Sequence, residues 1–300
     1  MTKTLLFFTP DPETRSHHGR WPAVLDAYRQ ALARLDVEIL DAPWSAPLTR
    51  DYDLIVPLVA WGYHNAPDRF RAVMGDLRDK ELRVFNPPDI VSWNVDKRYL
   101  RDLADGGVRI IPTQFVEQIT EAAVHQAQAD FGDALVLKPV VSAGAKNTLI
   151  WHNGDIPAFD AIDDRAGPPK GAAMIQPFMP AIQSEGEWSL LFFAGEFSHA
   201  VLKTPKSGDF RSQPDYSANL RPLAPPAEAM LLAADAIDFI GADRLLYARV
   251  DMVRDQHGRF CLMELELIEP DLYLTYAHGA ADRFKHAVEV ALFGGCGCHS

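Results

Sequence analysis

The first ninety residues alternate between short apolar runs and segments with helical periodicity. Each apolar run has the length and the flanking prolines or turn residues of a buried strand. Strands that alternate with helices are typical of a parallel sheet, so residues 1–90 are predicted to form a small open α/β domain. The expected strands are residues 3–10, 37–43, 52–62 and 82–87, and the expected helices are residues 21–36 and 67–80.

Beyond residue 90 the pattern changes to hairpins with interspersed helices. Apolar segments return on themselves after tight polar turns, which favours antiparallel pairing. Ser92 is a suitable N-cap for the first of these helices, and Gly106 is a suitable stop. Hairpins are expected at residues 134–153, 187–204 and 247–267, a strand at 172–180, helices at 92–106, 120–130, 227–241 and 280–292, and surface loops at 154–171 and 205–219.

The composition is that of an ordinary globular protein, with 48% hydrophobic and 23% charged residues among 300. This length suits two or three lobes. No apolar stretch approaches the roughly 18 to 20 residues of a membrane helix, and no signal-peptide pattern is present. Three cysteines cannot form a disulfide framework, so a cytoplasmic location is predicted. The net charge of −12 argues against a nucleic-acid partner, though not against a nucleotide.

The last expected hairpin carries Arg249-Val-Asp251 on one strand and Glu264-Leu-Glu266 on the other. Residues two apart in a strand share a face, so Glu264 and Glu266 point the same way. A turn at His257-Gly258 would place Asp251 opposite Glu264, with Cβ atoms roughly 5 Å apart, and Arg249 opposite Glu266. Three carboxylates this close predict a Mg²⁺ site, because that ion binds carboxylates and substrate phosphates together. The alternative is an exposed sheet face with an Arg249–Glu266 ion pair.

Two lysines are candidate phosphate ligands. Lys138 ends an apolar run and precedes Pro139, which suits a charge held at a strand end. The small residues from Ser142 to Gly144 follow, and their backbone N–H groups could approach a phosphate, although the spacing is not that of a Walker A loop. Lys97 lies in an expected helix. Taken alone, Lys138 also fits a snorkelling lysine and Lys97 a solvated charge.

A connector with nucleotide-binding potential follows the strand at 172–180. The backbone N–H and C=O groups of Gln176-Pro-Phe178-Met179 could bind the edge of an adenine. Glu187, a few residues later, could accept hydrogen bonds from ribose hydroxyls. The alternative is that Glu187 is a surface charge at the start of the next hairpin.

Two loops of the N-terminal domain are candidates for an acceptor site. His17-His18 follows the first strand, and Trp61-Gly-Tyr63-His64 follows the third. Ligands of open α/β domains bind at these strand ends. Either loop could instead be an ordinary polar surface.

Taken in order, the segments around Lys97, Lys138, Gln176 and the carboxylate hairpin resemble the ATP-grasp superfamily. The likeness covers about residues 86–270 and is greatest to the branch of glutathione synthetase, the ribosomal-protein glutamate ligase and cycloserine synthetase. MELELIEP and SEGEWSLLFF are similar to the cycloserine-synthetase-like subgroup. Two features depart from the wider pattern: Glu266 stands where many members carry asparagine, and the phosphate loop has fewer glycines.

The resemblance implies an ATP-grasp fold, in which two α+β lobes clasp ATP beside the N-terminal α/β domain. The implied divisions are residues 1–90 for that domain, 91–179 for the small lobe and 180–300 for the large lobe with the metal site. Phosphate contacts are implied for Lys97, Lys138, Ser142 and Gly144, adenine contacts for Gln176, Phe178 and Met179, a ribose contact for Glu187, Mg²⁺ or Mn²⁺ ligation for Asp251, Glu264 and Glu266, and an acyl-phosphate contact for Arg249.

The resemblance also implies an enzyme that uses ATP to phosphorylate a carboxylate and then joins the acyl group to an amine or another nucleophile. The substrate would be small and amino-acid-like or peptidic, with intramolecular cyclisation as one option. Lys203, Arg211 and the loop 205–219 are the expected cover over the acyl-phosphate. Two other functions stay open, a kinase-type enzyme and a nucleotide-binding regulatory protein without turnover. A homodimer is also implied.

Overall fold

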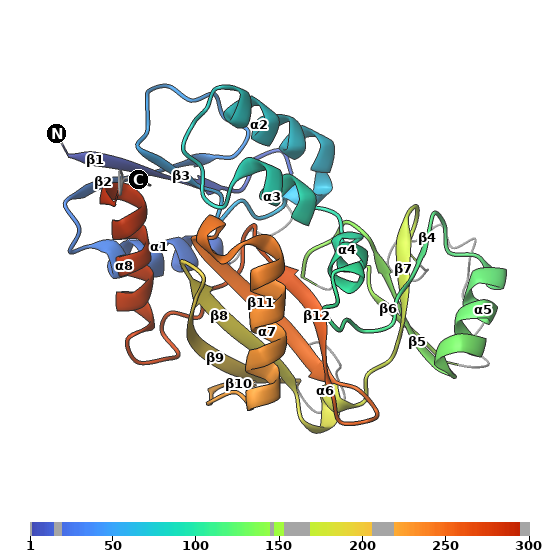
Figure 1. Cartoon of the computed structure of the whole chain (residues 1–300). Helices are drawn as coiled ribbons and strands as arrows, with labels where there is room; N and C mark the ends of the chain where they lie inside the picture. Colours follow the sequence, from blue (N-terminus) through green and yellow to red (C-terminus); the bar gives the residue numbers. More distant parts are fainter. Residues whose placement is uncertain (1, 15–19, 145–146, 153–168, 206–218, 295–300) are drawn as a thin grey trace.

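Three β-sheets organise the chain in a computed structural model that describes residues 2–14, 20–144, 147–152, 169–205 and 219–294 (Figure 1). The N-terminal sheet is parallel, and the other two are antiparallel. This combination of α/β and α+β architecture is the one that the sequence predicted. The parallel sheet has the order β2 (Val37–Pro43), β1 (Lys3–Thr9) and β3 (Leu54–Val56).

Helices α1 (Trp21–Leu32) and α2 (Pro67–Asp79) of the N-terminal domain agree with the sequence prediction. The expected strand at 82–87 was wrong in extent, because Val84 forms a single parallel bridge with Ile55. The prolines that follow direct the chain into a helix instead of along the sheet.

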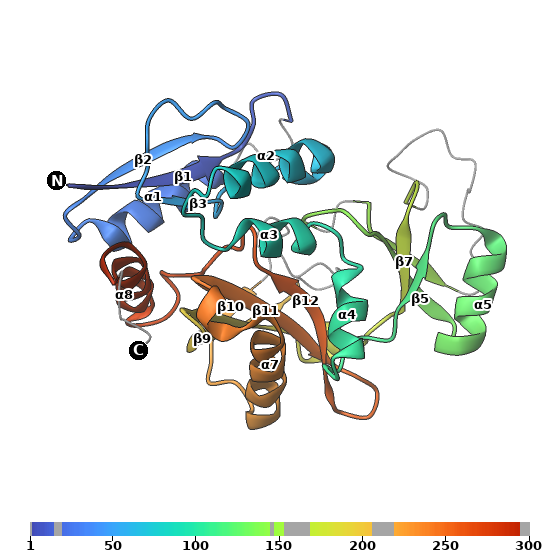
Figure 2. The ribbon, with the colours of Figure 1, turned by 45° about the horizontal axis from the view of Figure 1, so that its top comes forward.

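The large sheet has helices against both faces (Figure 2). Its strands are β10 (Asn219–Pro222), β9 (Glu196–Thr204), β8 (Glu187–Phe193), β11 (Tyr247–Arg254) and β12 (Phe260–Glu266). Alternate residues of β8 divide between two cores, as strand geometry requires. Leu190 and Phe192 pack with α7 (Ala227–Ile240), whereas Leu191 and Phe193 pack with α8 (Ala280–Phe293) and the N-terminal domain.

The face of the large sheet opposite α7 changes from apolar to charged along its strands. Leu191 and Phe193 lie at the apolar end of β8, and Glu187 and Ser189 continue the same face toward the other end. Lys203 is paired directly with Glu187 across β9 and β8, so it shares this face. The charged end is where the candidate site lies.

The single helix expected at 92–106 is two short helices, α3 (Pro88–Asn94) and α4 (Tyr99–Asp105). Ser92 was wrongly assigned as an N-cap, because it lies inside α3. Gly106 does cap the C-terminal end of α4. The break at residues 95–98 places Lys97 outside regular helix, which explains why its backbone N–H can bond to Val140 O instead of to its own turn, at 2.7 Å.

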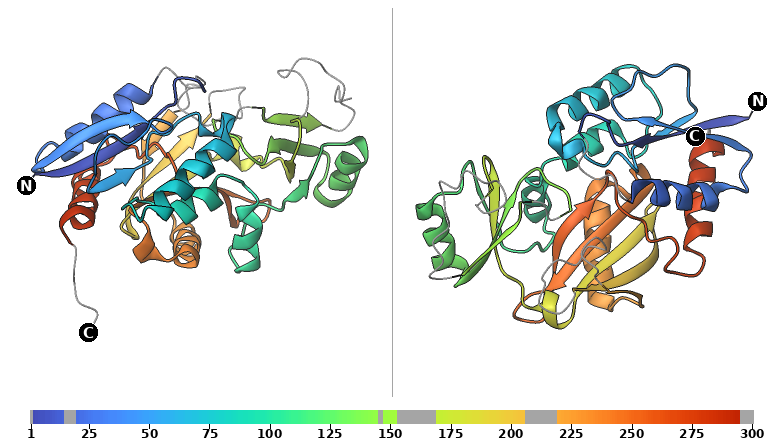
Figure 3. Two further views of the ribbon diagram at one scale, coloured as in Figure 1. Left: turned by 90° about the horizontal axis from the view of Figure 1, so that it is seen from above. Right: turned by 180° about the vertical axis from the view of Figure 1, so that it is seen from behind.

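The four-stranded sheet lies to one side of the large sheet, next to α4 (Figure 3). Its order is β4 (Gln114–Val116), β7 (Ala173–Pro177), β5 (Ala134–Pro139) and β6 (Leu149–His152), and α5 (Glu121–Phe131) packs against it. Thr120 caps α5 by accepting a hydrogen bond from the Ala123 amide. No helix in the described part of the chain is both long and apolar enough to span a membrane.

Candidate active site

The β11–β12 hairpin has the register that the sequence predicted. Asp251 lies opposite Glu264, and Arg249 lies opposite Glu266. A register shift begins immediately after Asp251, so the charged positions lie on the regular side of the irregularity. Directly opposed residues project from the same face, and the hairpin therefore brings one guanidinium and three carboxylates together.

Asp251 is the most enclosed of the three carboxylates, with 3% of its side chain exposed. It accepts hydrogen bonds from Arg249 Nη2 at 2.9 Å and from Ser189 Oγ, and Lys203 Nζ is 3.5 Å away. Burial opposes the charge, but Arg249 and Lys203 outweigh it and lower the pKa of Asp251 to about 2. Asp251 is therefore an ionised carboxylate whose oxygens are already bonded to protein donors.

Lys203 lies within β9, with 1% of its surface exposed. Its ammonium group forms a salt bridge with Glu187 in addition to its approach to Asp251. The expected place of Lys203 in the covering loop was wrong, because it lies at a buried position of a strand. Its role at the acyl-phosphate stays a prediction. Arg211 and nearly all of the proposed covering loop lie outside the described residues.

Glu187 is likewise buried, at the first position of β8, where it bonds to Lys203. The interpretation as a surface charge was wrong. In this arrangement the carboxylate that was predicted to bind ribose is bound by Lys203. Its ribose role stays a prediction.

Glu264 and Glu266 are more accessible, with side chains 33% and 27% exposed. Arg249 Nη2 also bonds to Glu266, so the ion pair of the alternative hypothesis is present. Lys97 Nζ lies 3.0 Å from Glu264 Oε1 and donates to Ser142 O at 2.7 Å. Lys97 thus connects β12 with the loop after β5.

Lys138 is brought to the same place from β5. Its side chain is half-buried, and desolvation lowers the pKa of its ammonium group. The charges of Glu264 and Glu187 act in the opposite direction, and Lys97 adds to the lowering. The two lysines predicted to bind phosphate, separated by forty residues in sequence, therefore influence each other directly.

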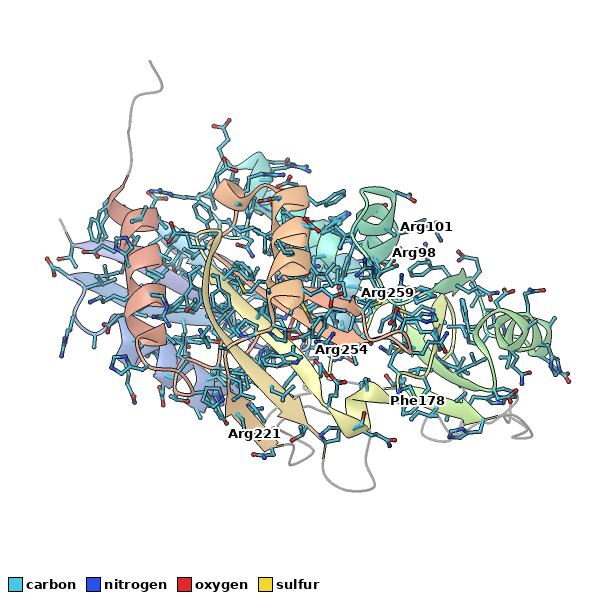
Figure 4. The ribbon with its side chains drawn as sticks, turned by 60° about the horizontal axis from the view of Figure 1, so that its bottom comes forward. Arg98, Arg101, Phe178, Arg221, Arg254 and Arg259 are labelled. Atoms are coloured by element: carbon cyan, nitrogen blue, oxygen red, sulfur yellow. The ribbon has the colours of Figure 1, made fainter. Side chains whose placement is uncertain are left out.

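The connector after β7 passes from the small sheet to the large one, and Phe178 lies on it (Figure 4). Gln176 is buried and donates from Nε2 to Thr113 Oγ1 at 2.9 Å, while the Phe178 amide donates to Ala134 O at 2.8 Å. Both groups are thus engaged within the protein. Within the described chain, the Met179 amide donates no hydrogen bond, which leaves it suited to an adenine acceptor.

Side chains from α3 and α4 hold the outer edge of β12. Asn94 donates to Leu265 O at 2.8 Å and accepts from the Leu267 amide at 3.0 Å, and Tyr99 Oη accepts from the Leu265 amide at 2.9 Å. These contacts satisfy backbone groups that a neighbouring strand would otherwise bond. They fix the strand that presents Glu264 and Glu266.

The donor chemistry at Glu264 and Glu266 fits a hard cation. Both are partly exposed carboxylates on one face of β12, and oxygen ligands of this kind suit Mg²⁺. Among the described residues, no group of three or more His, Cys, Asp or Glu side chains is arranged to hold a metal ion. Each predicted ligand is paired with Arg249, Lys203 or Lys97.

Comparison with known proteins decides the family. The family described as the ATP-grasp domain of prokaryotic glutathione synthetase matches residues 108–257. The cycloserine biosynthesis protein DcsG of Streptomyces lavendulae is 31% identical over 220 residues, which are 69% of this chain and 72% of that protein. The chain belongs to the ATP-grasp family. It is an ATP-dependent ligase, an enzyme that forms C–N bonds.

Further relatives agree with membership of the ATP-grasp family. Glutathione synthetase of Prochlorococcus marinus (strain MIT 9313) is 26% identical over 249 residues, 77% of this chain and 75% of that protein. The crystal structure of D-cycloserine synthetase DcsG has a TM-score of 0.78 and 26% identity, covering 96% of this chain and 99% of that one. D-alanyl-alanine synthetase A of Vibrio cholerae has a TM-score of 0.70 over 97% and 99% of the two chains, and at 14% identity it shows the fold alone.

The ATP-grasp fold gathers Lys97, Lys138, Arg249, Glu264 and Glu266 at the junction of the small and large sheets. Sequence reasoning missed residues that support or adjoin this cluster. Ser189 could have been found from its place two residues after Glu187 on a strand face, whereas Asn94 and Glu269 gave no signal of their own. The missed residues are Asn94, Tyr99, Ser189 and Glu269.

Proposed function

We propose that this ATP-grasp ligase phosphorylates a small carboxylic acid with ATP and transfers the acyl group to an amine. The observation that carries the proposal is the convergence of Lys97, Lys138 and Arg249 beside the partly exposed Glu264 and Glu266. Phosphoryl transfer depends on positioning and on neutralisation of charge, and this set supplies both.

In the first step, a carboxylate oxygen of the substrate attacks the γ-phosphorus of ATP. The bond from that phosphorus to the β–γ bridging oxygen breaks, and ADP leaves with the bond's electron pair. Lys97 and Lys138 neutralise charge on the phosphates, and the Met179 amide binds the adenine edge. Glu264 and Glu266, with Asp251 behind them, would hold Mg²⁺, which when bound would neutralise phosphate charge.

In the second step, the amine nitrogen attacks the acyl carbon of the acyl-phosphate. A C–N bond forms, the C–O bond to phosphate breaks, and inorganic phosphate leaves while the nitrogen loses its extra proton to solvent. Arg249 is held by Asp251 and Glu266 and lies over the Tyr273 ring at 5.5 Å. A guanidinium fixed in this way suits the oxyanion that forms during acyl transfer.

The named relatives favour an amino-acid-like substrate, because they include a cycloserine biosynthesis protein and glutathione synthetase. A substrate that carries both carboxylate and amine would give a cyclic product. The cytoplasmic location and the homodimer stay predictions.

The test is a screen of amino acids, dipeptides and amino-oxy acids with Mg-ATP, measured by ADP and phosphate release and followed by mass analysis of the product. Formation of an amide, linear or cyclic, with one ADP for each bond supports the proposal. A stable phosphorylated product without a C–N bond would instead show a kinase-type enzyme. Nucleotide binding without ADP from any member of the pool would point to a regulatory protein.

A further inference from the structure

The segment that follows β12 is held in place by side chains from distant parts of the chain. Two of its carbonyls are bonded by the N-terminal domain: Glu269 O accepts from Trp61 Nε1 at 3.2 Å, and Pro270 O accepts from Tyr28 Oη at 3.1 Å. Tyr247 Oη donates to Ile268 O at 2.7 Å. The backbone of Glu269 is therefore fixed where the N-terminal domain meets the large sheet.

The side chain of Glu269 differs from every other carboxylate in the active site. Asp251, Glu264 and Glu266 each pair with a lysine or an arginine. The Glu269 carboxylate is half-buried, and among the described residues it forms no hydrogen bond and no ion pair. Desolvation raises the pKa of this carboxyl, and the charge of Glu266 raises it further.

The pKa of Glu269 responds to the charged groups of the β11–β12 cluster. Besides Glu266, the groups that influence it are Arg249, Glu264 and Lys97. On the other side lies the loop after β3, where the phenol of the buried Tyr63 is influenced by Glu269 and Glu264. This loop also supplies Trp61, whose indole N–H bonds to Glu269 O, so Glu269 lies where the loop after β3 meets the segment after β12.

We propose that Glu269 binds the ammonium group of the acceptor substrate, in a subsite completed by Trp61 and Tyr63. The inference deepens the proposed function and rests on it. It assigns to this end of the site a cationic primary amine, either on a second molecule or at the far end of the acyl donor. Glu269 binds and orients this group, and no covalent bond to Glu269 forms. The ammonium loses one proton to solvent before its nitrogen attacks the acyl carbon, and the nitrogen loses a second proton after the C–N bond has formed.

The chemistry of the subsite favours a cation over other ligands. A half-buried carboxylate without an ionic partner is poorly compensated until a positive charge approaches it. Aromatic rings beside it add attraction for an ammonium ion. The position also has the required geometry, because Arg249 marks where the acyl oxyanion would form, and an attacking nitrogen must lie next to that group.

The test compares two acceptors competing for one acyl donor. The donor is the carboxylate found active in the substrate screen, and the competitor is hydroxylamine, which is neutral at neutral pH and forms a hydroxamate. Wild-type enzyme and Glu269→Gln are given Mg-ATP, the donor, its amine and hydroxylamine together. The ratio of hydroxamate to amide is measured by mass spectrometry. If the amine belongs to the acyl donor, the amide counted is the cyclic product.

Loss of a charge-assisted contact predicts a rise of at least about tenfold in this ratio for Glu269→Gln. The rate of hydroxamate formation should stay within about threefold of wild type, because the neutral acceptor makes no use of the carboxylate. Asp271→Asn is the matched control. It removes a carboxylate from the same segment, but one already bonded to Arg20 at 2.5 Å, and it should leave the ratio unchanged.

An unchanged ratio in Glu269→Gln would overturn the subsite while leaving the proposed function intact. An equal rise of the ratio in Asp271→Asn would also overturn the proposed subsite, because loss of any negative charge from this segment would then have the same effect. If wild-type enzyme forms neither hydroxamate nor amide from any carboxylate, the proposed function fails, and the subsite fails with it.

Discussion

The active site contains two kinds of carboxylate that look alike in sequence. Asp251 lies under the cluster, 3% exposed, and is bonded to Arg249 and Ser189. Glu264 lies directly opposite it in the register, 33% exposed, and has Lys97 as its ionic partner. The Asp251 carboxylate is fully bonded within the protein, whereas Glu264 can exchange Lys97 for a ligand.

The difference shows how one hairpin can both support and perform chemistry. A buried ion network is costly to break, because removal of one member leaves the others charged and desolvated. In the Glu264–Lys97 pair the carboxylate is 33% exposed and the lysine side chain 11% exposed, so water reaches it more readily than it reaches Asp251, and the pair can open when a ligand offers better contacts. Asp251 is therefore expected to position Arg249 and Lys203, while Glu264 and Lys97 separate to admit metal and phosphate.

The largest effect is expected for Asp251→Asn. Arg249 and Lys203 would stay charged and buried without their shared counter-ion, so unfolding should require about 3 to 5 kcal/mol less free energy. Denaturant unfolding of the ligand-free protein measures this, with Glu38→Gln, which breaks an exposed pair with Arg50, as a control that should change stability by less than about 1 kcal/mol. If Asp251→Asn were as stable as wild type, Asp251 would not have the structural role that distinguishes it here from Glu264.

The same buried face should also respond to pH through His199 on β9. Burial lowers the pKa of His199 to about 4, and its Nε2 donates to Leu272 O at 3.1 Å. The unfolded chain therefore takes up a proton first as the pH falls below about 6.5, so stability is full above that pH and is lost toward pH 4. The loss should reach about 3 kcal/mol. His199→Gln should flatten this part of the profile, and an unchanged slope would contradict the assignment.

Glu264→Gln should separate chemistry from stability. Because its side chain is one-third exposed, the ligand-free protein should change by less than about 1 kcal/mol. Turnover should fall by about a hundredfold or more, since charge stabilisation at the phosphates would be impaired. Melting curves with and without Mg-ATP, together with ADP release, test both parts. A mutant that melts several degrees lower yet keeps full turnover would show that Glu264 stabilises the fold and does not take part in catalysis.

A smaller effect is expected for Lys138→Ala. ATP affinity should fall at least tenfold, about 1.4 kcal/mol, because one phosphate contact is lost. Stability without nucleotide should be unchanged or slightly higher, since burial and Lys97 already disfavour this charge. Calorimetric titration of ATP measures the change, with the exposed Lys80→Ala as the control. Normal ATP binding by Lys138→Ala would instead support the alternative that Lys138 is a snorkelling lysine without a phosphate contact.

Much of the fold could be predicted because local pattern and tertiary structure agree. The hairpin expected at 187–204 and its turn at Ala194-Gly195 are both found in the structure, where these two residues have φ angles of 49° and 77°. The helix expected at 92–106 failed for a tertiary reason. The segment has helical periodicity throughout. The side chains of Asn94 and Tyr99 bond to the edge of β12, and the helix is interrupted between these two residues.

The sequence by itself determined which residues meet across the β11–β12 hairpin, because strand geometry and one turn fix the register of Asp251 with Glu264. It could not determine which of the two is buried, since burial depends on what packs above the strand face. Lys203 beneath the cluster and Glu269 at its rim are products of that packing: one is enclosed by β8 and β11, and the other is placed by the contact of Trp61 with the segment after β12. Local periodicity carries no information about contacts between residues two hundred positions apart, and those contacts decided which charges are fixed and which are available to a substrate.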